Sequence, residues 1–255
     1  MNTTPASTPG SSQAEPLPMF YSNIEAVSSQ LHKDLKIRAE NDFSFAARIN
    51  TVPLTVPEFT MVARHFPILL LGDELVPSAA LGISPDQNLF VDADGRWDNR
   101  TFIPAYVRRY PFILLGNMGN DAQLTLGVDS GTKPTEGALR PLFGADGKET
   151  EVVKQALDLC EQFHNAFLYT REFSDALKKT DIVEDCTLEI EPTPGQKRNL
   201  GTFKRINEEK FKNLPDAVVL EWHKRGFLHA VIFLLQSMNN WDQLLAKAGM
   251  FAPRI

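Results

Sequence analysis

The clearest pattern in the sequence is a run of apolar residues that occurs twice. Residues 64–72 and 108–116 share one order: arginine, a basic residue, an aromatic residue, proline, four apolar residues and glycine. Two shorter matches follow each run in the same order, 81–83 with 126–128 and 89–95 with 142–147. Three matches in one order predict an internal repeat, with copies at about 58–95 and 102–147.

Each copy predicts the same set of elements. Apolar residues at three- and four-residue spacing precede each proline, which is typical of one face of a helix. Pro67 and Pro111 end these helices, because the residue before a proline is pushed out of the α region. The apolar runs that follow are typical of strands buried on both faces. With second strands at 79–83 and 124–128, each copy is a helix-strand-strand unit.

The flanks of the repeat predict further strands and helices. An amphipathic helix is expected over 151–167 and a separate one from residue 173, and the alternation over 186–191 predicts a half-exposed strand. A helical pair follows around Gly226, a typical helix-ending residue, and its helices span 216–225 and 228–238. Together these elements predict an α+β fold, in which a mixed or antiparallel sheet is built from the two repeated units, flanked by helices, with a C-terminal helical pair.

The first residues differ in composition from the rest. Residues 1–18 are rich in Thr, Ser, Pro and Gly and bury too little apolar surface to offset the entropy of ordering, so we expect a disordered tail. They lack the basic and apolar regions of a secretory signal. Residues 19–255 are expected to form a single domain, and the protein is expected in the cytoplasm. Cys160 and Cys186 are too few for a disulfide framework and are interpreted as two separate buried thiols.

Charge and hydropathy narrow the class of partner. The chain has 255 residues, a net charge of −6 and a pI near 5.4. Proteins that bind duplexes usually carry a Lys/Arg-rich face. The helical pair superficially suggests a helix-turn-helix, but its second helix is apolar on three sides and is expected to pack inside. No apolar run approaches the ~20 residues needed to cross a bilayer. We therefore expect no nucleic acid partner and no membrane span.

No motif in the sequence identifies catalytic or metal chemistry. None of the five histidines lies four residues from another, or near a cysteine at a zinc-type spacing. Residues 92–95 are similar to part of a calcium loop, but Phe90 would then be the first ligand, so a turn at Asp94 and Gly95 is the better interpretation. Phosphate-loop, dinucleotide and nucleophile-elbow motifs are missing. No metal and no cofactor are expected, and a site assembled from scattered residues stays open.

Several segments resemble the SapC family. The most specific is Ile-Pro-Ala-Tyr-Val-Arg-Arg-Tyr-Pro-Phe at 103–112, in the second copy. Others are Phe-Ser-Phe-Ala at 43–46, Asn-Leu-Phe-Val-Asp at 88–92, Gly-Arg-Trp at 95–97 and Gly-Phe-Leu at 226–228. The resemblance covers about 19–245. It implies a link to surface-layer protein production or export in Gram-negative bacteria, or to outer-membrane receptors and flavin-dependent halogenases, and it supplies no agreed catalytic residues.

Two functions from different classes stay open. The first is a cytoplasmic accessory or binding protein of a bacterial surface-layer or outer-membrane uptake system, with an unknown protein or small molecule as its partner. The second is an enzyme acting on a small molecule or peptide at a cleft between the two copies. A third hypothesis, a structural component of the surface layer, predicts a periplasmic or surface location.

The candidate ligand- or partner-binding residues are Arg64, Trp97, Tyr106, Arg108 and Arg109. Arg64 and Arg108 occupy equivalent positions of the two copies, and a pair of arginines can clamp a carboxylate or phosphate. The alternative for every candidate is structural, in packing or at the carboxyl end of a helix, where a cation is favoured.

Overall fold

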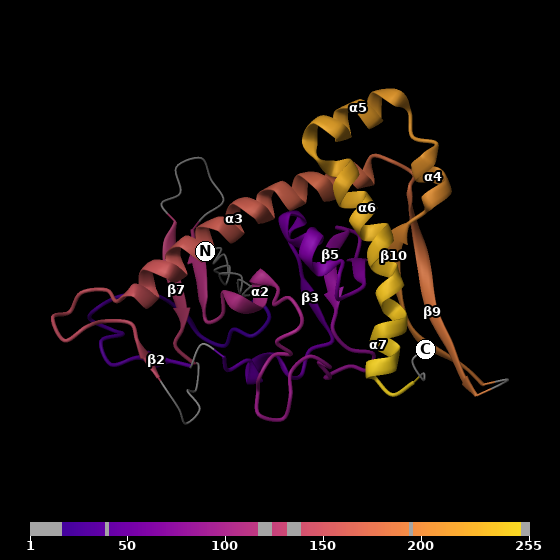
Figure 1. Ribbon diagram of the computed structural model, residues 1–255. Helices are drawn as coiled ribbons and strands as arrows, with labels where there is room; N and C mark the ends of the chain where they lie inside the picture. The colour runs from indigo at the N-terminus through magenta and orange to yellow at the C-terminus, as the bar shows by residue number, and fades with distance from the viewer. Residues whose placement is uncertain (1–16, 39–40, 117–123, 132–138, 194–195, 251–255) are drawn as a thin grey trace, which may run out of the picture.

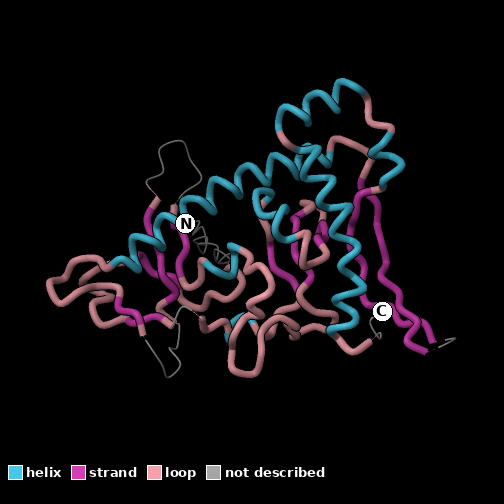
Figure 2. Tube along the Cα trace, in the orientation of Figure 1, coloured by secondary structure: helices cyan, strands magenta, loops and turns pink. Residues whose placement is uncertain are grey.

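The computed structural model describes residues 17–38, 41–116, 124–131, 139–193 and 196–250. Its longest helix, α3 (Glu151–Lys178), runs across the molecule and joins two groups of strands (Figure 1). Figure 2 shows the strands gathered beneath the two ends of this helix. The predicted disordered tail lies outside the described residues except for its last two positions.

The larger sheet has five strands and is antiparallel throughout. Its order is β3 (Thr51–Pro53), β5 (Val76–Ala80), β4 (Ile68–Leu71), β10 (Gln196–Ile206) and β9 (Val183–Thr193). β4 lies in the middle, and its Ile68, Leu69 and Leu70 are buried. The apolar run of β4 fits this place, because a central strand covered on both faces has no side in water. β9 and β10 have 11 residues each and extend well beyond the strand expected over 186–191.

The second group of strands contains a three-stranded sheet and a two-stranded ribbon. The sheet has the order β1 (Ile24–Ala26), β7 (Thr125–Asp129) and β6 (Phe112–Leu115), and the ribbon pairs β2 (Lys36–Ile37) with β8 (Arg140–Pro141). β6 is an edge strand, and the three residues after Phe112 are partly exposed. The prediction that this strand is buried on both faces is therefore wrong, because Ile113 and Leu114 border a cleft.

The two segments that the sequence predicts to be copies of a repeat contain the same kinds of element in the same order. The first has α1 (Phe59–Val62), β4 and β5, and the second has α2 (Ala105–Arg108), β6 and β7. A β-bridge follows in each, Val91 with Trp97 and Phe143 with Glu149. Gly95 and Gly147 turn inside these bridges at φ of 77° and 75°, so the turn expected at Asp94 and Gly95 is confirmed. The two segments contribute to different sheets instead of one common sheet, and the repeat itself stays a prediction.

The carboxyl-terminal part is helical and contains the expected pair, which confirms the α+β class with a C-terminal helical pair. Its elements are α4 (Glu208–Lys212), α5 (Asp216–Arg225), α6 (Phe227–Ser237), η3 (Met238–Asn240) and α7 (Trp241–Lys247). Gly226 ends α5 at φ of 76°, a left-handed conformation that glycine adopts without a steric penalty. Phe227, Val231 and Leu234 of α6 are buried, so one face of this helix packs against the core, whereas Ile232 on the same helix is half exposed.

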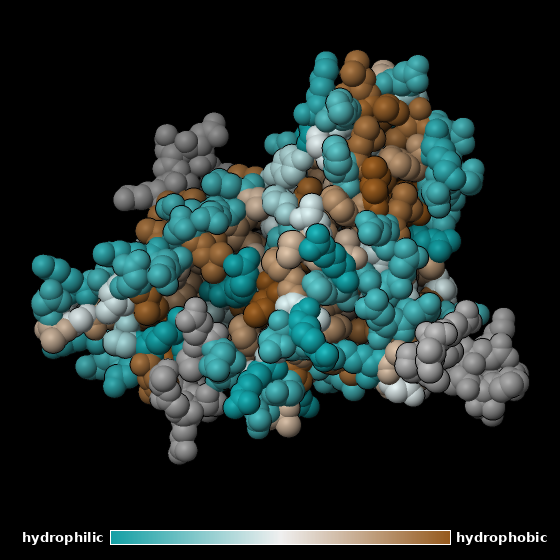
Figure 3. Space-filling model, viewed as in Figure 1, coloured by the Kyte–Doolittle hydropathy of each residue, from teal (hydrophilic) through white to brown (hydrophobic). Residues whose placement is uncertain are grey.

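The outer side of the same helical pair carries exposed apolar side chains. Val219 and Leu220 of α5 and Ile232 of α6 form what we call the C-terminal apolar patch, and Figure 3 shows apolar atoms gathered over these helices. Among the described residues, no helix combines the length and apolar character that a membrane crossing requires.

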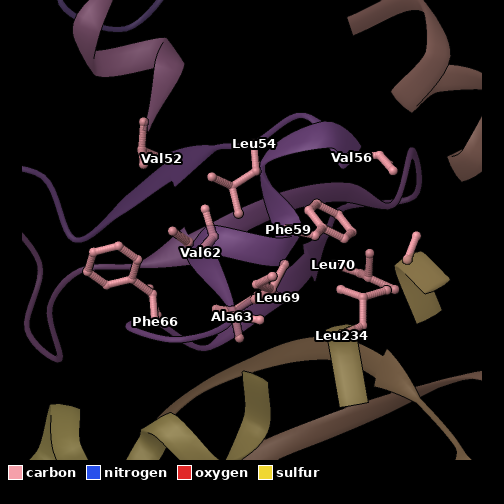
Figure 4. Packing of buried hydrophobic residues seen from close by; sticks show 14 of the residues in the cluster. Val52, Leu54, Val56, Phe59, Val62, Ala63, Phe66, Leu69, Leu70 and Leu234 are labelled. Atoms are coloured by element: carbon pink, nitrogen blue, oxygen red, sulfur yellow. The ribbon is translucent and has the colours of Figure 1, made fainter. Parts of the chain in front are cut away.

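Two hydrophobic clusters hold the fold together. The first surrounds the five-stranded sheet, and Figure 4 shows Phe59, Leu69 and Leu70 of the first segment together with Leu234 of α6. The second lies between the three-stranded sheet, the ribbon and α3, and includes Phe112. Side chains from α3 belong to both clusters, so this helix ties the two halves to each other.

α3 is one continuous helix, whereas the sequence predicted one helix over 151–167 and another from residue 173. That prediction is wrong. Residues 168–172 contain no glycine or proline that would break a helix, and both hydrophobic clusters pack against the continuous element.

Candidate functional site

A cleft of about 560 Å³ lies between the two segments, along one side of α3. This volume is within the range of about 300–1,000 Å³ that is typical of small-molecule sites. Its walls are mostly apolar: Pro53, Leu54, Val76 and Pro77 on the side of the first segment, Tyr106, Ile113 and Leu114 on the side of the second, and Phe163 and Phe167 on α3. We call it the inter-segment cleft. It lies where the sequence hypothesis placed a ligand, between the two segments.

Arg109 is the buried charged group of this cleft. Its side chain lies between two rings, with the guanidinium carbon 4.4 Å from the ring centroid of Tyr106 and 4.3 Å from that of Phe163. The residue is only 8% exposed, and its Nε is buried without a hydrogen-bond partner. The described residues provide no ion pair to it. Burial also raises the pKa of the neighbouring Tyr21 well above its usual range, although Arg109 opposes the shift.

The energetics of Arg109 favour an anion as a partner. Cation–π contacts contribute up to about 2 kcal/mol each when they are desolvated. Removing an ion from water costs several kcal/mol, and an unpaired buried charge is not compensated by a counter-ion. Two aromatic faces therefore offset only part of the desolvation cost. A carboxylate or sulfonate of a ligand would supply the missing hydrogen bonds and charge.

Glu58 positions the short helix α2, which contains Tyr106 and is followed directly by Arg109. Its Oε1 accepts a hydrogen bond from Ala105 N at 2.6 Å, at the start of α2. Its Oε2 accepts from Thr55 N at 3.0 Å and from Thr55 Oγ1 at 2.8 Å, at the start of η2 (Val56–Glu58). A helix of a single turn is not stable alone. The place of Arg109 in the cleft therefore depends on a buried carboxylate from the first segment.

Cys160 and His164 both line the cleft, one helical turn apart on α3. This four-residue spacing was not recognised as significant in the sequence. Only the orientation of α3 in the structure places both side chains in the wall of the cleft. Burial raises the pKa of the Cys160 thiol to about 11, and nearby Arg109 only partly opposes this. Because the thiolate is the nucleophilic form, a thiol that stays protonated at neutral pH is not activated.

The Cys160 thiol is expected to react slowly. A pKa of about 11 leaves roughly one thiol in a thousand ionised at pH 8. In a Cys186→Ser variant, which keeps only Cys160, we expect alkylation by iodoacetamide at pH 8 to be at least about 100-fold slower in the folded protein than in denaturant. Mass spectrometry of timed samples measures both rates. Comparable rates would reveal an activated thiolate and would favour the enzyme hypothesis.

The other candidate residues are distributed over different surroundings. Arg108 is exposed, and its Nε donates to Ile103 O at 3.1 Å. Trp97 is buried away from the cleft, where its Nε1 donates to Thr101 Oγ1 at 3.0 Å. Arg64 is exposed and lines neither this cleft nor the pocket that contains Arg108.

The structure therefore brings Tyr106 and Arg109 into direct contact, and it places Arg108 in a neighbouring pocket that Arg109 also lines. It does not place the equivalent arginines, Arg64 and Arg108, around a common cavity. Phe163 was not a candidate in the sequence. It lies more than 50 positions after Arg109, and only the packing of α3 against α2 makes it part of the site. Among the described residues, no group of three or more His, Cys, Asp or Glu side chains is arranged to hold a metal ion.

Comparison with known proteins agrees with the segments singled out in the sequence. The family model described as SapC matches residues 27–244, which include both segments, α3 and most of the helical carboxyl-terminal part. Searches of curated proteins and of solved structures give no match. Since the family model spans most of the 255 residues, the chain belongs to the SapC family.

Proposed function

We propose that this protein is an accessory protein that binds a small organic anion with an apolar body in the inter-segment cleft. The observation that carries the proposal is Arg109, a buried guanidinium without a counter-ion among the described residues, in a cleft whose walls are mostly apolar. Apolar walls provide contact area, and one charged group provides orientation, which is the usual design of a small-molecule site.

A binding role is favoured over catalysis by the state of the ionisable groups in the cleft. The Cys160 thiol has a raised pKa, so it is not a ready nucleophile. At the other end of the cleft, Lys178 is paired with Glu74 and with Asp175, and these pairs are partly exposed. Ion pairs such as these at the rim of the cleft are suited to closing or shaping its entrance, but they are not suited to proton transfer. The enzyme alternative keeps one supporting observation, the cysteine–histidine pair on α3.

The biological setting is also part of the proposal. Membership of the SapC family supports a role beside a bacterial surface-layer or outer-membrane uptake system. We propose the cytoplasm as the location of the protein. Fractionation of native cells with an antibody against the full chain tests the location. Recovery from the periplasmic or surface fraction would contradict this placement and favour a structural component of the layer.

The cleft is tested with 1-anilinonaphthalene-8-sulfonate, which combines apolar rings with one anionic group. We expect one molecule to bind per chain with a Kd of tens of micromolar, roughly −6 kcal/mol. A Leu114→Glu variant places a like charge beside the sulfonate in the cleft wall, and we expect it to weaken binding at least about tenfold. Fluorescence titration measures both constants.

The matched control is Leu220→Glu, which introduces the same charge into the C-terminal apolar patch, where the side chain is 56% exposed. We expect this variant to change the Kd of the dye for the cleft less than twofold. Equal weakening by the two substitutions would show that the dye binds apolar surface in general, and the cleft would lose its assigned role. Circular dichroism confirms that both variants are folded.

A further inference from the structure

A second cavity, of about 310 Å³, shares Arg109 with the inter-segment cleft and lies against the amino-terminal half of α3. We call it the arginine pocket, because four arginines line it: Arg38, Arg108, Arg109 and Arg140. They come from three places in the sequence: Arg38 follows β2, Arg108 and Arg109 are neighbours at the end of α2, and Arg140 lies in β8. The remaining walls are mainly apolar, with Phe43, Phe45, Ile103, Val107, Phe112, Val152 and Leu159.

The charge of this pocket is opposite to that of the chain. Four arginines and one carboxylate, Asp42, give its lining a formal charge of +3, in a protein whose net charge is −6. Asp42 is hydrogen-bonded by Arg38 at 2.9 Å. The other three arginines have no ion pair among the described residues. Like charges gathered against apolar walls repel one another, and a multivalent anion removes this repulsion.

The unsatisfied hydrogen-bond donors point to the same pocket. Among the described residues, two buried side-chain nitrogen atoms have no hydrogen-bond partner, Arg38 Nε and Arg109 Nε. Both belong to residues that line the arginine pocket, and Arg109 is more than nine-tenths buried. Arg140 is held close by, since its Nε donates to Arg38 O at 3.2 Å. Buried donors without partners are costly, so their concentration at one cavity indicates a ligand that accepts hydrogen bonds.

We infer that the arginine pocket binds a small organic anion with at least two negative charges. The planar fork of arginine matches the oxygen atoms of phosphates and carboxylates equally well, so these two sources share one recognition chemistry. The aromatic and aliphatic walls fit a non-polar carbon skeleton beside the charged groups. This site is separate from the proposed function of the cleft, although Arg109 borders both cavities.

The test is isothermal titration of the full chain with pyrophosphate and with citrate at low ionic strength. We expect at least one of them to bind with a Kd below about 100 μM and to bind several-fold more weakly at ~0.3 M salt, where charges are screened. Arg140→Gln and Arg108→Gln are each expected to weaken binding at least about tenfold. Preference for pyrophosphate identifies a phosphorylated ligand, and preference for citrate identifies a polycarboxylate.

Arg64→Gln is the matched control, because Arg64 holds the equivalent position in the first segment and lines neither cavity. It should leave the Kd within twofold. Failure of both anions to bind at 1 mM, or equal weakening by Arg64→Gln and Arg108→Gln, would overturn the inference. Two further variants separate this site from the cleft. Leu114→Glu should retain pyrophosphate or citrate binding, and Arg140→Gln should retain naphthalenesulfonate binding.

Discussion

An Arg109→Met variant is expected to lose affinity for both probes, naphthalenesulfonate in the cleft and the multivalent anion in the arginine pocket, by at least about 100-fold each. The reason is that one guanidinium borders both cavities and lacks an ion pair among the described residues. Methionine fills much of the same space without charge or donors. The titrations described for the two cavities measure the loss.

The folded state should tolerate this substitution. Losing the cation–π contacts with Tyr106 and Phe163 costs up to about 2 kcal/mol each, and removing an unpaired buried charge returns several kcal/mol. We therefore expect the free energy of unfolding to change by no more than about 1 kcal/mol in urea denaturation. Arg109→Lys is the matched control: it keeps the charge but not the planar fork, and should retain part of the affinity. Parent-like binding of both probes by Arg109→Met would contradict both sites.

Replacing Asp129 with alanine is expected to lower the free energy of unfolding by about 4 kcal/mol. Asp129 is fully buried at the end of β7, and its carboxylate accepts hydrogen bonds from the backbone of Ser22, Asn23 and Gly131. The hydroxyl of Tyr110, next to Arg109, donates to it at 3.0 Å. Alanine removes the acceptor of these part-buried hydrogen bonds, and a hydrogen bond to a charged group contributes about 1.5–3 kcal/mol.

Denaturation in urea, followed by circular dichroism, measures this loss. Asp129→Asn keeps one acceptor oxygen and the side-chain shape, so it should lose about half as much. Asp146→Ala is the control, because Asp146 is exposed and its contacts are local: a hydrogen bond from Lys148 N and an ion pair with Lys148 Nζ at 3.7 Å. We expect a change below about 1 kcal/mol there. If Asp129→Ala were no more destabilising than Asp146→Ala, the carboxylate would not anchor the amino-terminal segment to β7.

Elements governed by local interactions agree well with the sequence. α5, Gly226 and α6 are close to their predicted positions, because amphipathic spacing and a left-handed glycine act within a few residues. The burial of β6 could not be predicted in this way. Its apolar run is nearly the same as that of β4, but β4 is central in a five-stranded sheet and β6 is at the edge of a three-stranded one. Neighbours supplied by distant parts of the chain decide that difference.

The candidate site likewise combines residues that the sequence identified with residues that only the structure revealed. Tyr106 and Arg109 were identified from the most specific segment of the family resemblance, and both line the cleft. Arg38 and Arg140 were not identified, because arginine is usually an exposed residue and the segment around each of them does not set it apart. Pairing of β2 with β8 brings them to one pocket. The spacing of Cys160 and His164 was visible in the sequence, but its direction toward the cleft was not.

By itself the sequence determined the α+β class, the carboxyl-terminal helical pair, the family and two of the residues that line the cleft. These follow from patterns that extend over about ten to twenty residues, where periodicity, proline and glycine act directly on the backbone. Only the tertiary structure decided that the two similar segments enter different sheets, that α3 continues across both, and that arginines from three distant parts of the chain surround one pocket. Those outcomes depend on long-range packing and on which buried charges find partners. Neither can be predicted from the spacing of residues within a short stretch of sequence.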